Sequence, residues 1–286
     1  RTVDNVFDAL IFGTDHPLGR TILGPKENIR AFKRKDFDSY LKRHYTPANV
    51  VVCIAGSFKE KNVLAKIKKE FGKLKHGEHI TPVPFAAKQS APRVAIKEKK
   101  TDQTQLMLGV PSYPYKHKDE FALAVLATIL GGGMSSRLFL EVREKRGLAY
   151  SVHAWVDKYP DTGYFVVQAG VEHAKLEKTV QTILAEFKKI KNTKVSAAEL
   201  KKAKAYIKGT KTLSLETSDE VAGNAASTLL NLGKVRTLED VLRGIDKITA
   251  ADVQRVARDI LVTRGLNLAI IGPHLHKEKL LSLLRI

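Results

Sequence analysis

The sequence lacks the features that mark disulfide-bonded or membrane-spanning proteins. It contains a single cysteine, Cys53, among 286 residues, which excludes an internal disulfide. Cys53 lies in the apolar run VVVCIAG, where we expect a buried small hydrophobic residue. No apolar run approaches the roughly 20 residues that a membrane-spanning helix needs, and the first residues show no signal-peptide pattern. We therefore expect a soluble protein without a membrane span. The sequence leaves its compartment open and slightly favours the cytoplasm.

Acidic residues are scarce relative to basic ones, with 30 Asp and Glu against 49 Lys and Arg, a net charge of +19. Lysine clusters at 97–101, 187–194 and 201–208 could form a footprint for nucleic acid or an anionic membrane. However, they fall mostly on exposed positions of amphipathic helices or beside turns, with no interleaved aromatic residues and no nucleic-acid motif. A solvated lysine-rich surface is favoured over a nucleic-acid-binding module. Attraction to acidic peptides stays open.

The segment Gly131–Val152, GGGMSSRLFLEVREKRGLAYSV, carries the strongest local signal. Three glycines follow an apolar helical run that ends near Leu130, at a point where we expect backbone angles that other residues resist. Ser135 or Ser136 can cap a second helix, which ends at Gly147. Apolar residues repeat with helical spacing inside that second helix, so one side of it is predicted to be buried.

From Ala149 onward the apolar period changes to two, which predicts a strand with Tyr150, Val152 and Ala154 on one face. Arg143 and Tyr150 then lie at the two ends of one short turn. A phosphate-binding loop is disfavoured, because the GxxxxGK[ST] pattern is absent and a helix, not a strand, precedes the glycines. Taken singly, the arginine is typical of a solvated charge and the tyrosine of a core residue.

The remaining pattern predicts one complete domain at 93–286, preceded by part of a similar domain at 1–74 and a proline-containing linker at 75–92. The first part contains a helix near 3–12 and an apolar strand at 50–56. The second part has strands first and helices after, which favours an α/β fold (an α+β sandwich) with helices packed on one face of a mixed, largely antiparallel sheet.

Several separated segments together resemble the pitrilysin and mitochondrial processing peptidase family of zinc proteases, also called insulinase-like. LGGGMSSRLF followed by EVREKRGLAYSV is similar to that family's second domain. Three other stretches agree in the same order: HPLGRTILGPKENI (16–29), YLKRHYTPANVVVCIAG (40–56) and LNLAIIGP (266–273). The resemblance covers residues 3–273 and implies that the chain is the C-terminal two-thirds of such a protease, truncated before residue 1.

The resemblance also implies a zinc site built from an HxxEH motif and a later glutamate, and neither element occurs in this chain. The segment most similar to this motif is His76-Gly77-Glu78-His79, but its histidines are three residues apart rather than four and fall in the linker. His274-Leu275-His276 is a similarly weak pattern. We therefore expect no metal site in these residues and place zinc on an upstream segment of the full-length protein.

By resemblance, Arg143 and Tyr150 are catalytic residues that hold the substrate backbone and polarise the scissile carbonyl. Gly131, Gly132, Gly133 and Ser135 are substrate-binding residues beside them. The expected whole protein is a zinc-dependent endopeptidase that closes two domains around a peptide or unfolded protein, while this chain alone is inactive. The edges of a strand near 105–111 are a further expected place for hydrogen bonds to the substrate peptide, by addition of a strand.

The family also contains subunits without zinc ligands, so a non-catalytic, processing-peptidase-like subunit that binds substrate or serves as a scaffold is the alternative. The presence of both Arg143 and Tyr150 argues against this alternative, because an inert scaffold does not need them. The implied partners are a peptide or unfolded substrate, and either the missing N-terminal segment or a homologous subunit, in a homo- or heterodimer.

Overall fold

A computed structural model describes residues 2–273 and 275–286, and their contacts form two compact units. The first, the sheet unit, comprises the residues up to Arg20 together with 84–209 and 241–286. The second, the helical unit, comprises residues 21–83 and 210–240. Each unit is described separately below.

A five-stranded sheet forms the centre of the sheet unit, in the order β1-β5-β2-β4-β3. The strands are β1 (Arg93–Glu98), β2 (Thr104–Ser112), β3 (Ala149–Lys158), β4 (Gly163–Val171) and β5 (Asn267–Gly272). β1 pairs with β5 in parallel, and the other three pairs are antiparallel. The predicted mixed, largely antiparallel sheet is confirmed.

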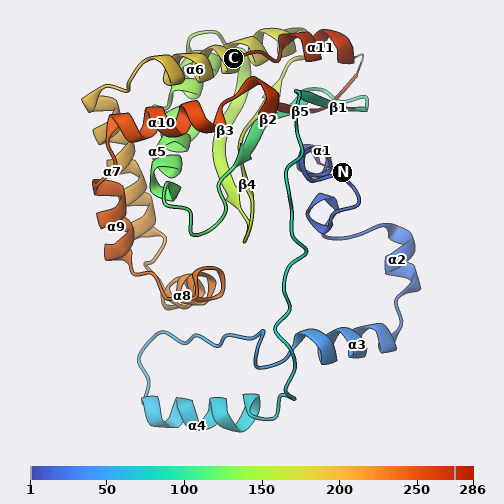
Figure 1. Cartoon of the computed structure of the whole chain (residues 1–286), viewed down its shortest axis with the longest axis vertical. Helices are drawn as coiled ribbons and strands as arrows, with labels where there is room; N and C mark the ends of the chain where they lie inside the picture. Colours follow the sequence, from blue (N-terminus) through green and yellow to red (C-terminus); the bar gives the residue numbers. More distant parts are fainter. Residues whose placement is uncertain (1, 274) are drawn as a thin grey trace. The chain divides into compact units, whose positions relative to one another are not determined.

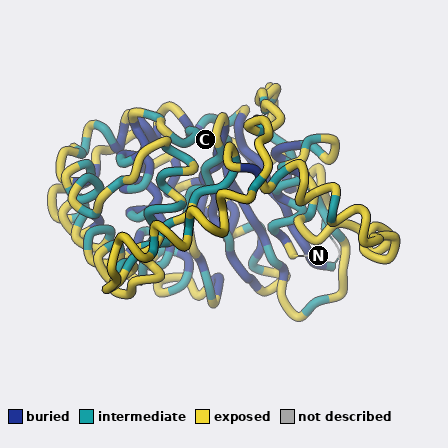
Figure 2. Tube along the Cα trace, turned by 90° about the horizontal axis from the view of Figure 1, so that it is seen from below, coloured by how far each residue is buried: buried dark blue, intermediate teal, exposed yellow. Residues whose placement is uncertain are grey.

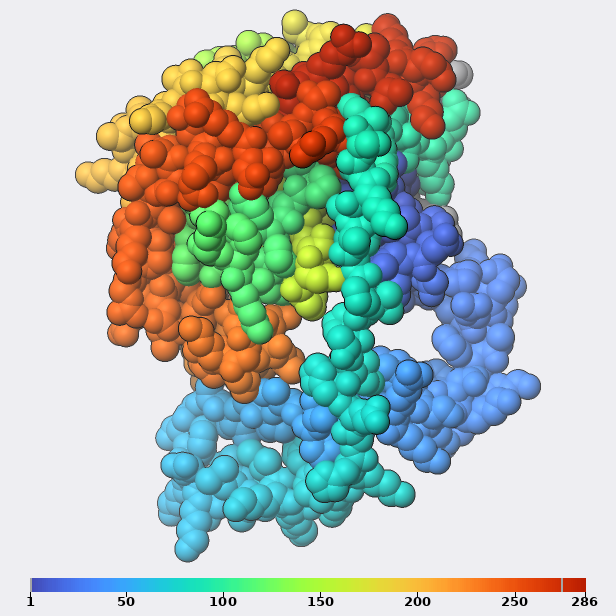
Figure 3. All heavy atoms as spheres, in the orientation of Figure 1, coloured from blue at the N-terminus to red at the C-terminus, as the bar shows by residue number. Residues whose placement is uncertain are grey.

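Helices cover one face of this sheet, as predicted, and Figure 1 shows α5 and α10 on that side. The helices of this layer are α5 (Glu120–Gly131), α6 (Leu176–Asn192), α10 (Ala250–Ile260) and α11 (Lys277–Leu283). Asp119, just before α5, accepts two hydrogen bonds from Arg255 of α10, at 2.8 and 2.7 Å. In Figure 3 the orange atoms of α10 accordingly lie against the green atoms of α5.

The second face of the sheet is covered in part by α1 (Val3–Phe12), a helix that the sequence had placed in the preceding domain. Its buried Phe7 packs with Met107 of β2 and Tyr164 of β4. Side chains alternate along a strand, so both faces of β2, β4 and β5 present apolar residues that must be covered. The compact units therefore do not coincide with the predicted ranges 1–74 and 93–286.

The helical unit consists of α2 (Lys26–Ala31), α3 (Arg34–His44), α4 (Glu60–Phe71) and α8 (Ser218–Leu232). α7 (Ala197–Leu213) and α9 (Leu238–Asp246) continue from one unit's residues into the other's. The predicted strand at 50–56 is absent from the described structure. Its side chains still alternate between half-buried and exposed, and Cys53 is half-buried rather than buried. An extended segment becomes a strand only when a neighbour satisfies its backbone, and none pairs with it among the described residues.

Buried apolar side chains occur only in the sheet unit among the described residues. They are dark blue in Figure 2, where exposed residues are yellow. Residues 75–92 contain neither helix nor strand, and Phe85 and Gln89 of that stretch are held by hydrogen bonds to Asp161 and Asn267. None of the helices in the described ranges is long and apolar enough to cross a membrane.

Candidate substrate-binding site

A π-helical turn, Phe139–Glu144, replaces the middle of the predicted helix at 136–146. The backbone N–H of Lys145 donates to the carbonyl of Leu140 at 2.9 Å, five residues back rather than four. Isolated π turns within helices are frequent at functional sites. Arg143 lies in this turn, and Gly147 follows it at a φ of 56°, where glycine avoids the strain that a side chain would cause.

β3 begins with a β-bulge at Tyr150. Ala149 pairs with Val171 and Ser151 with Gly170, so Tyr150 has no partner residue in the ladder. The sequence placed Tyr150 on one face with Val152 and Ala154, but those two are buried whereas Tyr150 is 77% exposed. The alternation fails here because a bulge inserts one extra residue and redirects its side chain.

The π turn and the bulge bring Arg143 and Tyr150 together. The guanidinium carbon of Arg143 lies 5.2 Å from the centre of the Tyr150 ring and 4.8 Å from that of Phe139. Such distances allow cation–π attraction on both rings. The Arg143 side chain is 39% exposed, and its nearest carboxylate oxygen, on Glu144, is 3.7 Å away. The pair therefore presents one guanidinium and one phenol to solvent, both hydrogen-bond donors.

The two other cations of the turn, Lys145 and Arg146, share one carboxylate. The Glu141 carboxylate accepts hydrogen bonds from Lys145, at 2.6 Å, and from Arg146. These two cations lower the pKa of Glu141 to about 2, so it stays ionised. Glu141 thus compensates Lys145 and Arg146, whereas Arg143 lies over the ring of Tyr150.

The three glycines differ in what they do, and none has the positive φ that their sequence suggested. A Cβ on Gly131 would lie 2.5 Å from the backbone nitrogen of Ala154, so glycine is needed for close packing of α5 on β3. A Cβ on Gly132 would meet Thr128 of the same helix at 2.7 Å. Gly133 instead lies against the ring of Tyr206, a residue of α7.

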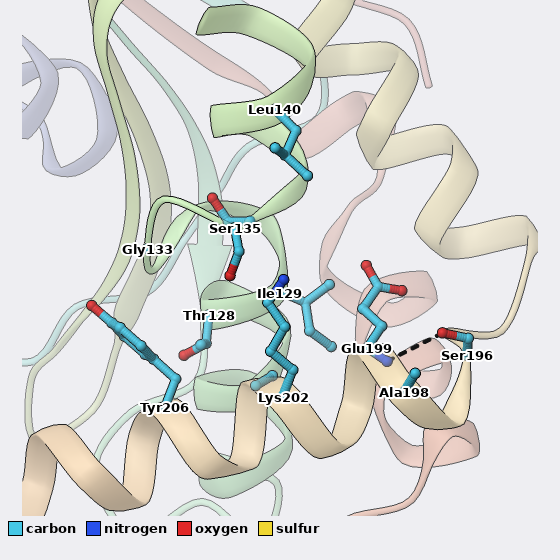
Figure 4. A pocket seen from close by; sticks show the side chains of 12 residues that line it. Thr128, Ile129, Gly133, Ser135, Leu140, Ser196, Ala198, Glu199, Lys202 and Tyr206 are labelled. Carbon is cyan, nitrogen blue, oxygen red and sulfur yellow. Dashed lines mark hydrogen bonds between the residues drawn. The ribbon is translucent and has the colours of Figure 1, made fainter. Parts of the chain in front are cut away.

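Two of the predicted substrate-binding residues, Gly133 and Ser135, line a cavity of about 360 Å³. Figure 4 shows it between the loop that carries them and α7, which contributes Glu199, Lys202 and Tyr206. Sequence reasoning missed this α7 wall, because nothing in a lysine-rich amphipathic helix indicates which distant loop it faces. Gly131 and Gly132 are not among the lining residues.

The predicted peptide-binding edge at 105–111 is wrong. β2 lies inside the sheet, paired with β4 along its whole length and with β5 over residues 105–109. Over residues 105–109 its backbone groups are therefore used on both sides, and the outer strands of the sheet are β1 and β3. The order of strands in a sheet depends on tertiary packing, which sequence periodicity does not encode.

The described residues include no group of three or more His, Cys, Asp or Glu side chains arranged to hold a metal ion. Glu78 and His79 line a cavity in the helical unit with Lys42 and Arg43, two cations unfavourable beside a divalent metal. His274 lies outside the described residues, so the His274/His276 pattern is not tested by the structure. The donor sets of the described residues thus do not fit zinc.

Comparison with known proteins shows to which protein family the chain is related. The family profile described as "Peptidase M16 inactive domain" matches residues 31–207. An uncharacterized zinc protease of Mycobacterium leprae is 34% identical over 287 residues, which cover 99% of this chain and 64% of that protein. The chain thus spans about two thirds of the length of such relatives.

Solved structures agree on the fold. A protease from Helicobacter pylori superimposes with a TM-score of 0.84 at 27% identity, covering 95% of this chain and 67% of that one. A peptidase M16 inactive domain from Pseudomonas fluorescens gives a TM-score of 0.86 at 22% identity, covering 96% and 66%. The predicted family resemblance is confirmed: the chain belongs to the peptidase M16 family, whose curated relatives are named zinc proteases.

Proposed function

We propose that this chain is the substrate-binding part of a zinc-dependent endopeptidase and that Arg143 and Tyr150 are its catalytic donors. The observation that carries the proposal is their juxtaposition: a π turn and a β-bulge place an exposed phenol 5.2 Å from an arginine. Both irregularities depart from the regular element that the sequence favours. Such departures are expected where function, not stability, selects the local geometry.

The chemistry that these two residues offer is hydrogen-bond donation to peptide oxygens. A guanidinium and a phenol that approach the same carbonyl stabilise the negative charge that grows on its oxygen during hydrolysis. The Phe139 ring also contacts the guanidinium, with its centre 4.8 Å from the guanidinium carbon, which favours an orientation of the donor before substrate arrives. The zinc and its activated water would come from residues outside this chain, and the relatives' extra third of length is where we place them.

The helical unit exposes apolar side chains that a partner segment would cover. None of its described apolar residues is buried, and several are exposed, including Phe37 at 58%, Tyr40 at 58% and Leu41 at 47% on α3. These positions recur with helical spacing and form an apolar stripe. We propose that this stripe packs against the zinc-bearing segment or a homologous subunit.

The test is substitution of the donors in the protein joined to its zinc-bearing segment. Removing one oxyanion donor lowers turnover about 100- to 1,000-fold in comparable sites. We expect losses of that order for Arg143→Ala and Tyr150→Phe, with zinc content unchanged by metal analysis. His153→Ala, on an exposed residue of the same strand, is the matched control and should keep full activity.

Turnover at the control level in both variants would reject the donor assignment. If the wild-type protein bound peptides but neither zinc nor turnover could be found, the non-catalytic substrate-binding subunit would replace the protease as the assigned function.

A further inference from the structure

The cavity beside Gly133 combines an apolar wall with polar groups at its mouth. Ile129 and Ala203 are buried side chains of its wall, and Leu140 adds a half-exposed one. At about 360 Å³ it has room for one peptide side chain rather than a large cofactor. Part of its lining, Gly133 to Leu140, belongs to the same segment, 131–150, that carries Arg143 and Tyr150.

Ser136 gives this cavity an unsatisfied hydroxyl. The residue is 6% exposed and lines the cavity, and its Oγ has no hydrogen-bond partner among the described residues. A buried hydroxyl without a partner costs on the order of 1–3 kcal/mol of folding free energy. A ligand atom that accepts its hydrogen bond would recover that cost.

Lys202 gives the cavity an uncompensated positive charge. Figure 4 shows its side chain extending from α7 toward Ser135, and no ion pair involves it in the described part of the chain. The carboxylate of Glu199 also lines the cavity, but both of its oxygens accept hydrogen bonds from Arg137, at 2.7 and 2.8 Å. The charge of Glu199 is therefore already matched by Arg137. The ammonium group of Lys202 makes the charge at the mouth of the cavity positive.

We propose that this cavity is a specificity subsite that takes an acidic side chain of the bound peptide. The methylene groups of the peptide residue would pack on Ile129 and Ala203. Its carboxylate would accept hydrogen bonds from Lys202 and from the hydroxyl of Ser136. Such charge-assisted bonds are stronger than neutral ones. This inference rests on the proposed function, because it needs a peptide to lie along the 131–150 segment.

The experiment measures peptide binding by this chain, so it requires no zinc and no turnover. The probe is a fluorescein-labelled, unstructured peptide of about 12 residues whose central residue is Glu, Gln or Lys, followed by fluorescence anisotropy. We expect the Glu peptide to bind about fivefold tighter than the Gln peptide and the Lys peptide to bind weakest. Free glutarate, tested in parallel, distinguishes a peptide side chain from a small free carboxylate.

Lys202→Gln should abolish the preference for Glu over Gln, and Ser136→Ala should weaken it while thermal melting confirms that the variant is folded. Lys201→Gln makes the same charge change on an exposed neighbour outside the cavity and should leave the preference intact. Equal binding of the three peptides, or equal effects of Lys202→Gln and Lys201→Gln, would overturn the subsite but leave peptide binding standing. Absence of any peptide binding would overturn the proposed function as well. Lys202-dependent binding of glutarate alone would reassign the cavity to a small carboxylate.

Discussion

At the scale of single residues, the lack of a side chain at Gly131 fixes the position of the loop that lines the candidate site. Its α-carbon packs against the β3 backbone, where an added Cβ would lie 2.5 Å from both the nitrogen and the Cβ of Ala154. The backbone of a paired strand cannot move away without breaking its ladder with β4. The end of α5, and with it the loop that carries Gly133 and Ser135, is therefore fixed by the absence of a side chain.

We predict that Gly131→Ala destabilises the protein by about 3 kcal/mol, measured by urea unfolding, because overpacking forces backbone shifts. Gly209→Ala is the matched control, since no atom lies within 4 Å of its added Cβ and its position is helical. That control should be neutral or stabilise by about 0.5–1 kcal/mol. Equal destabilisation by the two substitutions would contradict the packing argument.

At the scale of elements, α1 is held on the sheet by aromatic packing around one carboxyl group. Phe7 and Tyr164 meet edge to face with ring centres 5.2 Å apart, and the Tyr164 hydroxyl donates to Asp8 at 3.3 Å. Burial is the main cause that raises the pKa of Asp8 to about 6, and the charges of Asp157 and Asp4 raise it further. Tyr159 lies in the same cluster, and burial raises its pKa to about 12.

The Asp8 pKa predicts that the packing of α1 weakens as pH rises. An aspartate titrates near 3.9 when unfolded, so the folded protein binds the extra proton between about pH 4 and 6. The stability linked to that proton is complete below about pH 4 and is lost as pH rises through 6. Asp8→Asn should therefore stabilise the protein by about 1 kcal/mol at pH 7.5, after discounting for solvent screening, and have little effect at pH 4.

Thermal melting of both proteins from pH 4 to 8 measures this difference. Asp15→Asn removes the same charge from an exposed position. Its melting temperature should stay close to that of the wild type at every pH. A stabilisation by Asp8→Asn that is the same at pH 4 and pH 7.5 would show that the carboxyl group does not titrate in this range.

At the scale of the whole molecule, the two units differ in how much apolar surface they bury. All buried apolar residues among those described belong to the sheet unit, whereas the helical unit leaves large ones such as Ile22 and Phe32 exposed, at 103% and 56%. Local opening is cheap where few apolar contacts are lost. The helical unit is therefore expected to be the less stable part of this chain when no partner covers it.

Limited trypsin digestion under native conditions tests this expectation. We predict that the first cuts fall at Lys and Arg residues within 21–83 and 210–240, while peptide bonds of the sheet unit persist, as judged by mass spectrometry of the fragments. The helical unit should gain protection when the proposed zinc-bearing segment is added. First cuts spread evenly over both units would contradict the prediction.

The sequence by itself determined the family, the order of the strands and helices of the sheet unit, and the residues that face the core, because periodicity and turn chemistry are local. It also placed Arg143 and Tyr150 near one another in the chain. Only the tertiary structure decided that β2 is interior, that α1 covers the second face and that residues 50–56 form no strand, because these depend on which surfaces are left to be covered. The same holds for the bulge at Tyr150 and the wall of α7 beside Gly133, because each results from packing between segments distant in sequence, which no local pattern records. The π turn interrupts a helical pattern that periodicity alone predicts to be regular.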